Sequence, residues 1–337
     1  MRAEQVRVAW IVLLAPLVAR ESRPGAPGGN SIPLEIATSD SVLTGHGPSK
    51  SVPYTVSSSG TLHVWAISEA LDPFLRVESA EGVLLGEDDN GGGGKTPYLA
   101  LEVVKSATLR VTVASAGATG SGRADLDLRE SPETAQTRAA AEAAQESLKA
   151  ADALREKGDL DGAREKVRGT LESLEGVPGV GESAAATNAF WEIGLRAYAL
   201  GDLRTAFAAW GRVRDYREEF LPPDHPYLQA ARQNLALATK ALGDLPGARA
   251  LEERVLEVRS RALPDDHPDL QAARQNLAAT LNDLGDLPGA RALEEKVLEV
   301  LSRTLPDEHP ALQRARQNLA VTIKSLGDLP GARALEE

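Results

Sequence analysis

Three histidines recur at a fixed interval of 42 residues near the end of the chain, at His225, His267 and His309. Histidine is a common metal ligand and general acid or base, so its repetition raises the question of a chemical site. Residues one period apart in a repeat protein lie one repeat apart in space, too far to share a metal ion. Each histidine also stands between an acidic residue and a proline. We therefore expect the three to cap helices rather than to bind a metal.

The sequence lacks residues that other common catalytic motifs require. Gly94, Lys95 and Thr96 imitate the end of a phosphate-binding loop, but Asp89 stands where that loop needs its first glycine. The charge of an aspartate there would repel phosphate. The sequence contains no cysteine, and neither G-x-S-x-G nor H-E-x-x-H occurs in it. We therefore expect that the chain is not an enzyme.

An acidic loop offers a possible ion site. Asp88, Asp89 and Asn90, together with Asp72, supply the hard oxygen ligands that calcium prefers. The same Asp-Asn-Gly stretch builds a tight turn without any ion. The irregular spacing of the acidic residues favours the turn, and calcium is the alternative; no other cofactor is expected.

Amide side chains recur with the same period as the histidines. They occupy pairs of adjacent positions, with lysines one or two turns further on: Gln233 and Asn234, Gln275 and Asn276, Gln317 and Asn318, Lys240 and Lys324. A carboxamide both donates and accepts hydrogen bonds, so it can hold the backbone of an extended peptide whatever the peptide's sequence. Simple solvation of a helix surface is the alternative. We predict a peptide-binding surface at these positions.

These residues belong to a 42-residue unit. Residues 221–262 and 263–304 are near copies, and residues 305–337 begin a third. In the first copy, apolar or small residues recur every three or four positions over 228–242, which predicts a helix. Gly243 suits the left-handed position that ends a helix, and Asp244 suits the cap of the next one. Each unit is therefore predicted to be a helical hairpin that buries its apolar faces against its neighbours.

Particular positions of the unit carry a family resemblance. N-L-A at 234–236, G-D at 243–244 and Ala248, with the D-H-P loop and the 42-residue length, resemble the kinesin-light-chain variety of the tetratricopeptide repeat. The chain departs from that pattern at Glu252, Glu294 and Glu336, where the family usually has an aromatic residue. The resemblance implies a superhelix whose first helices line an inner groove, with the amide positions facing it.

The array extends backward from these copies. Gly-Asp-Leu turns begin at residues 158, 201, 243, 285 and 327, which predicts about five repeats over residues 136–337, the last incomplete. The second repeat gathers the aromatic residues of the array, which are Phe190, Trp191, Tyr198, Phe207 and Trp210. We interpret them as core residues, with a peptide-gripping role as the alternative.

Residues 32–130 change from helical spacing to alternation. Short β-branched or alternating runs cover residues 51–56, 61–67, 74–78, 98–104 and 108–114, separated by Gly, Ser, Asp and Asn. Alternation over 62–67 and 109–114 is typical of half-buried antiparallel strands, and the spacing favours a β-sandwich. G-T-L at 60–62, D-P-F-L at 72–75, G-V-L-L at 82–85 and D-D-N-G at 88–91 resemble the bacterial pre-peptidase C-terminal domain. That resemblance implies a jelly-roll-like sandwich of a secreted multidomain protein.

The first 31 residues resemble an export signal and a linker. Arg2 and Arg7 precede an apolar run over residues 8–19. A membrane-spanning helix needs about 20 apolar residues, so this run predicts a cleaved signal peptide over residues 1–19 rather than a stable membrane span. A buried N-terminal helix is the alternative. Residues 20–31 are rich in Gly and Pro and are expected to be a linker. The mature protein is then periplasmic, attached to the cell envelope or extracellular.

These observations predict a multidomain protein, an all-β sandwich followed by an all-α solenoid, that binds a protein or peptide partner. The net charge of −12 and the pI of about 5.1 argue against nucleic acid as the partner. The alternative is that the chain is the regulatory N-terminal part of a larger bacterial enzyme, such as a caspase-like peptidase, whose catalytic domain lies beyond residue 337. The third copy stops inside its second helix. We therefore expect a piece of a longer protein whose last repeat frays.

Overall fold

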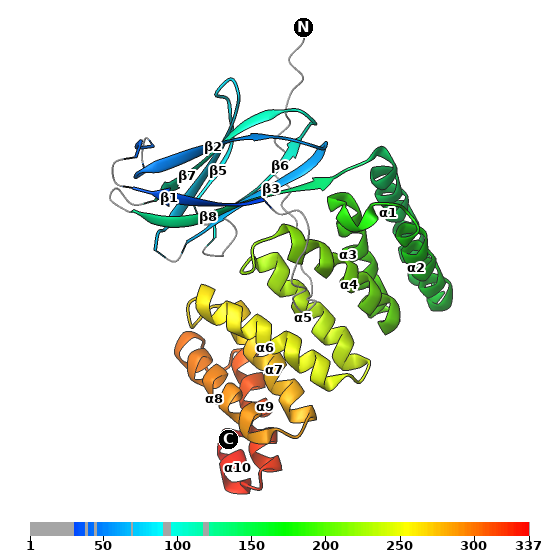
Figure 1. The fold of residues 1–337 in the computed structure, drawn as a ribbon. Helices are drawn as coiled ribbons and strands as arrows, with labels where there is room; N and C mark the ends of the chain where they lie inside the picture. Colours follow the sequence, from blue (N-terminus) through cyan, green and yellow to red (C-terminus); the bar gives the residue numbers. More distant parts are fainter. Residues whose placement is uncertain are drawn as a thin grey trace.

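The computed structural model describes residues 30–37, 40–43, 46–68, 70–89, 96–116 and 121–336. Within these residues, eight β-strands form a sandwich and are followed by ten α-helices in a curved array (Figure 1). The predicted fold class, a β-sandwich followed by a helical solenoid, is confirmed. The expected signal peptide, most of the expected linker and Asn90 lie outside the described residues.

The sandwich consists of two antiparallel four-stranded sheets. In chain order the strands are β1 (Asn30–Ile36), β2 (Ser49–Thr55), β3 (Gly60–Ile67), β4 (Pro73–Ser79), β5 (Leu84–Asp88), β6 (Tyr98–Val103), β7 (Thr108–Ser115) and β8 (Gly122–Pro132). One sheet has the order β1-β8-β3-β6 and the other β2-β7-β4-β5. Alternate residues of both sheets point inward and form one apolar core, as in other β-sandwiches.

Five of the eight strands match the predicted runs closely, whereas β1, β5 and β8 were not predicted. The expectation that β3 is half-buried is wrong, because every residue from Thr61 to Ala66 is buried. Leu62, Val64 and Ala66 face the core of the sandwich. The intervening residues, Thr61, His63 and Trp65, are buried on the opposite face of the sheet.

The ten helices form five antiparallel pairs. They are α1 (Ala135–Glu156), α2 (Leu160–Glu175), α3 (Ala184–Ala199), α4 (Leu203–Phe220), α5 (Pro226–Ala241), α6 (Leu245–Ala262), α7 (Pro268–Asp283), α8 (Leu287–Thr304), α9 (Pro310–Ser325) and α10 (Leu329–Glu336). We call the first helix of each pair (α1, α3, α5, α7, α9) an A helix and the second a B helix. A short 3-10 turn (Val180–Glu182) lies in the longer connection before α3.

The predicted turn chemistry recurs from pair to pair. Gly243, at φ +92°, ends α5 in the left-handed region, and the Asp244 carboxylate accepts a hydrogen bond from Gly247 N at 2.9 Å. The histidines cap the last three A helices, as predicted. Nδ1 of His225, His267 and His309 accepts from the backbone N–H two residues further on, at 3.1, 3.1 and 3.2 Å.

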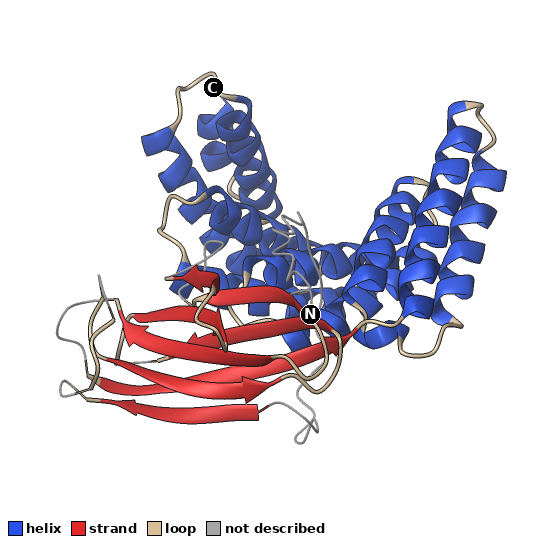
Figure 2. Cartoon of the chain, turned by 90° about the horizontal axis from the view of Figure 1, so that it is seen from above, coloured by secondary structure: helices blue, strands red, loops and turns tan. Residues whose placement is uncertain are grey.

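The helix pairs follow a curved path, and the sandwich lies beside it (Figure 2). Consecutive A helices contact each other through polar side chains, such as Asn282 of α7 and Thr322 of α9, whose side chains are 2.9 Å apart. In the described part of the chain, no helix combines the length and apolar character that crossing a bilayer requires.

Candidate functional site

The outer face of β3 packs against α4 and the start of α5. His63, on that face and 4% exposed, lies 6.0 Å from the Tyr216 ring of α4 and 5.4 Å from the Phe220 ring. Tyr98 of β6 stacks on the other side of His63 and contacts the ring of His225 edge-on at 4.9 Å. The array therefore covers a sheet face that would be exposed in an isolated sandwich.

A directional hydrogen-bond chain crosses this junction. The Tyr216 hydroxyl donates to Ser131 Oγ at 2.9 Å, and Ser131 Oγ donates to the Glu182 carbonyl oxygen at 2.6 Å. Because the Tyr216 hydroxyl has one proton, His63 Nε2–H must donate to it (3.0 Å), and the Tyr98 hydroxyl donates to Nδ1 (2.6 Å). Burial lowers the pKa of His63 to about 3, which keeps the ring neutral, as this chain requires.

Charged groups fix the same junction from its two ends. Glu133, after the last strand, accepts from Ser183 Oγ at 2.7 Å and from Ala185 N at 3.3 Å, so its carboxylate lies at the N-terminus of α3. Arg129 of β8 stacks over Trp65 and donates to the Glu219 carbonyl oxygen of α4. Both anchors join the sandwich to the second helix pair, α3 and α4.

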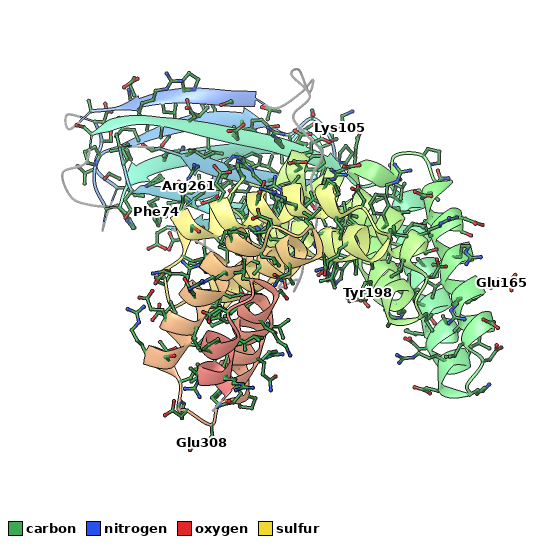
Figure 3. The ribbon with its side chains drawn as sticks, turned by 90° about the horizontal axis from the view of Figure 1, so that it is seen from below. Phe74, Lys105, Glu165, Tyr198, Arg261 and Glu308 are labelled. Carbon is green, nitrogen blue, oxygen red and sulfur yellow. The ribbon has the colours of Figure 1, made fainter. Side chains whose placement is uncertain are left out.

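A groove of about 880 Å³ lies beside this junction. One wall is the outer face of β3 and β6, including Ala100 and Glu102. The other wall is the N-terminal half of α1 and of α3, and the floor includes Tyr216 and Tyr227. Lys105, in the turn after β6, marks the end of the sandwich that meets these first helices (Figure 3).

The predicted peptide-binding amides lie on α5, α7 and α9, at equivalent positions of three consecutive A helices. Gln233, Asn234, Gln275 and Asn276 are half-buried, and Gln317 and Asn318 are exposed. Gln233 Oε1 accepts a hydrogen bond from Arg259 at 2.7 Å, so one of these amides also supports the packing of α6. The set forms a ladder with one rung per repeat.

The basic residues of the A helices are engaged with acidic partners. Lys240 lies 2.7 Å from Asp283 of the next A helix. The buried Arg232 is 2.7 Å from Glu218, and Arg274 and Arg316 are 2.6 and 2.8 Å from Asp265 and Asp307. Lys324 is exposed. These ion pairs neutralise most of the positive charge of the A helices α5, α7 and α9.

An apolar row beside the amides was not predicted. It occupies one equivalent position in four A helices, filled by Leu195, Leu237, Ala279 and Val321. All four are exposed, Val321 at 63%. An apolar residue follows each amide pair by one helical turn and recurs every 42 residues. This pattern in the sequence could have predicted the row.

The B-helix position that departs from the family pattern is buried. Trp210 holds it in α4, and Glu252 and Glu294 hold it in α6 and α8, each 5% exposed or less. The facing A-helix residue changes with it, because Gly194 lies against the Trp210 indole while alanine stands at the equivalent positions of α5 and α7. Burial raises the pKa of Glu252 to about 7. The repeats thus exchange one large ring for a small buried carboxyl group.

The calcium candidates do not form a cluster among the described residues. Asp88 Oδ2 accepts from the backbone N–H of Tyr98 at 2.8 Å, which ties β5 to β6. No group of three or more His, Asp or Glu side chains suited to a metal ion occurs in the described ranges. Asn90, the remaining candidate ligand, lies outside them.

Known proteins are similar to this chain in its helical part. Residues 228–269 and 270–311 match the family model of the tetratricopeptide repeat. A search of curated proteins gives no match. These two matched segments have the same 42-residue length as the units found in the sequence and overlap them in a shifted frame, and the family model supports that part of the predicted resemblance.

Solved structures of repeat proteins match a larger part. A Podosopora anserina putative kinesin light chain with nearly identical TPR-like repeats matches at 22% identity and a TM-score of 0.49, over 57% of this chain and 90% of that one. A point variant of that Podosopora anserina protein matches at 21% identity and a TM-score of 0.50, over 60% and 93%. BtubC (BKLC) from P. vanneervenii matches at 17% identity and a TM-score of 0.45, over 60% and 89%. The match to the point variant supports the solenoid fold of the array.

Proposed function

We propose that this chain is an exported interaction scaffold, in which the A-helix face of the solenoid binds an extended segment of a partner protein. The observation that carries the proposal is the ladder of amides on α5, α7 and α9, beside an exposed apolar row with the same period. A solenoid of this kind offers the same contact once per repeat along one curved surface. Such a surface suits a partner that is itself extended and regular.

The ladder favours recognition of the main chain and of apolar side chains. Carboxamides such as Asn276 and Asn318 pair with peptide groups irrespective of sequence, and Leu237 and Val321 offer apolar contact area beside them. Most basic groups of the A helices already have acidic partners. The proposed ligand is therefore an uncharged, extended segment.

The test is the triple variant Asn234→Ala, Asn276→Ala and Asn318→Ala. Each lost hydrogen bond should cost about 0.5–1.5 kcal/mol of binding free energy, so three should weaken partner binding at least tenfold. Calorimetric titration of a partner identified in the native host measures this loss. Circular dichroism should show unchanged helicity, because these side chains are not core residues.

The matched control changes the B helices at the same interval. Glu257→Ala with Glu299→Ala removes two exposed side chains of α6 and α8. Partner affinity should stay within about twofold of the unmodified chain, since exposed ion pairs contribute little. Equal loss in both variants, or no loss in the asparagine variant, would show that the amides do not form the binding surface.

Export is part of the proposal and rests on the basic and apolar pattern of residues 1–19 and on the resemblance of residues 32–130 to a domain of secreted proteins. N-terminal sequencing of the protein purified from its native host tests it. The expected mature protein lacks the leader. Cytosolic protein that retains Met1 would rule export out.

A further inference from the structure

The edges of the two sheets differ in how they are protected from further pairing. β1 carries Pro33, and β2 carries Pro53 and Lys50. The pairing of β5 with β4 is irregular between Val77 and Glu78. Proline, lysine and bulges are the usual devices that stop an edge strand from accepting another strand.

β6 is an edge strand without these devices. Its register with β3 runs unbroken from the Trp65–Tyr98 pair to the Gly60–Val103 pair, and it contains no proline or lysine. Ala66 N donates to Pro97 O at 3.4 Å, so the backbone carbonyl of Pro97 points toward β3. In an antiparallel pair, the backbone N–H and C=O groups of successive residues point alternately toward the partner strand and away from it. The N–H and C=O groups of Ala100 and Glu102 therefore point away from β3. Asp88 already satisfies the equivalent N–H of Tyr98.

The open edge borders the junction groove rather than a bare surface. Ala100 and Glu102 line it from the sheet, and alanines of α1 and α3 line it opposite: Ala135, Ala139, Ala184 and Ala185. Small residues leave space for an additional backbone and its side chains. The six residues of β6 offer roughly 20 Å of extended template.

The charges of the groove indicate what kind of segment fits. Among its described lining residues, Glu102, Glu133 and Glu142 are acidic, and Arg138 and Arg217 are basic. Arg217 is buried and donates to the Tyr227 carbonyl oxygen, whereas Glu102, Glu142 and Arg138 make no ion pair with a described residue. Glu133 is already bound to the start of α3. A lysine or arginine of the bound segment, placed between Glu102 and Glu142, would balance the negative charge that remains in the groove.

We propose that an extended segment of a partner protein, with a lysine or arginine among small and apolar residues, adds to β6 as a further strand of the sheet. Its backbone pairs with Ala100 and Glu102, and α1 and α3 cover its outer side. This binding site goes beyond the amide ladder, which lies on α5, α7 and α9. The scaffold would then have two separate binding sites for its partners.

The test uses the whole chain and a fluorescent ten-residue peptide of alternating threonine and valine with one central lysine. Ala100→Pro removes the outward N–H, and an edge strand tolerates proline at such a position. Fluorescence anisotropy should show affinity about tenfold or more weaker for this variant. Ala100→Val, which keeps the N–H, should bind within about twofold of the unmodified chain. The same peptide methylated on alternate backbone nitrogens should not bind.

Amide hydrogen exchange gives the position of the strand. Peptide binding should slow exchange at Ala100 and Glu102, whose N–H groups have no hydrogen-bond acceptor among the described residues. If the proline variant loses its β-sheet circular dichroism signal, Glu102→Lys is the deciding variant, because it keeps the backbone N–H groups. It should weaken binding of the lysine peptide but not of the same peptide with glutamate in place of lysine.

Several results would overturn the proposal. One is the absence of any binding by the lysine peptide, and another is equal affinity for Ala100→Pro. A third is a dimer of the chain that Ala100→Pro dissociates, because the edge would then serve a second copy. The asparagine triple variant should bind this peptide normally, so failure here and failure of the amide ladder are separate results.

Discussion

Replacing Glu252 by glutamine is expected to raise the free energy of unfolding above pH 7 and to leave it almost unchanged at pH 4. Glu252 lies inside the solenoid between α6 and α7, where burial raises the pKa of its carboxyl group to about 7 from 4.5. Its Oε2 has no hydrogen-bond partner among the described residues. The charged form is therefore the unfavourable one in the folded protein.

The sign follows from proton binding. Between pH 4.5 and 7 the folded carboxyl group holds a proton that the unfolded one has lost, so its contribution to stability is complete below pH 4.5 and is lost as pH rises through 7. Glutamine cannot ionise and escapes this loss. One pKa unit corresponds to about 1.4 kcal/mol, and after allowance for local relaxation we expect a gain of about 1–3 kcal/mol at pH 8.

Urea denaturation at pH 4 and pH 8 measures the difference. Glu257→Gln, exposed on the same helix, is the control and should change stability by less than about 0.5 kcal/mol at either pH. Lys240 and Asp283 act on the charge of Glu252 in opposite directions, and burial outweighs both in raising its pKa. A gain of equal size at both pH values would show that glutamine acts by packing and not by removing a charge.

Gly194→Ala is expected to destabilise the second repeat, although alanine is normally the better helix former. A methyl group on residue 194 of α3 would overlap the indole of Trp210, which is 2% exposed. Overpacking of this kind costs about 1–3 kcal/mol. Thermal unfolding followed by circular dichroism should show a lower melting temperature.

Gly169→Ala is the matched control for that substitution. Gly169 lies inside α2, and a methyl group there would meet no other atom within 4 Å. The control should gain about 0.5–1 kcal/mol from helix propensity alone, so the two glycine variants should shift in opposite directions. Valine is the residue type at the equivalent position of α2, so adding Trp210→Val should relieve the overlap. The double variant should then lose less free energy of unfolding than the two single variants lose together. Additive effects would contradict the direct contact.

The helical part was predictable because its signals are local. Gly243 at a positive φ, Asp244 as the cap of α6 and His225 as the cap of α5 each depend on residues within one turn. Repetition at 42 residues confirmed these signals several times within one chain. The strand β5 was missed although its partner β4 precedes it directly, because its residues LLGED include no β-branched or aromatic side chain. The strands β1 and β8 were missed because each pairs with a strand distant in sequence.

The junction was beyond the reach of sequence analysis for the same reason. Alternation in β3 identifies which residues face the core, but it does not show that α4 covers His63 and Trp65 from outside. Likewise, Lys240 is recognisable as a basic residue of an A helix, whereas its partner Asp283 lies one repeat away. The exchange of Gly194 and Trp210 for alanine and glutamate was visible at the 42-residue interval and needed only the fold to explain it.

Amide hydrogen exchange of the complex with the partner identified in the native host will show whether the A-helix face holds that partner. We predict slower exchange in the A helices α5, α7 and α9, around Asn234, Asn276 and Asn318, with the exposed faces of α6 and α8 unchanged. Protection confined to the B helices, or to the sandwich alone, would contradict it.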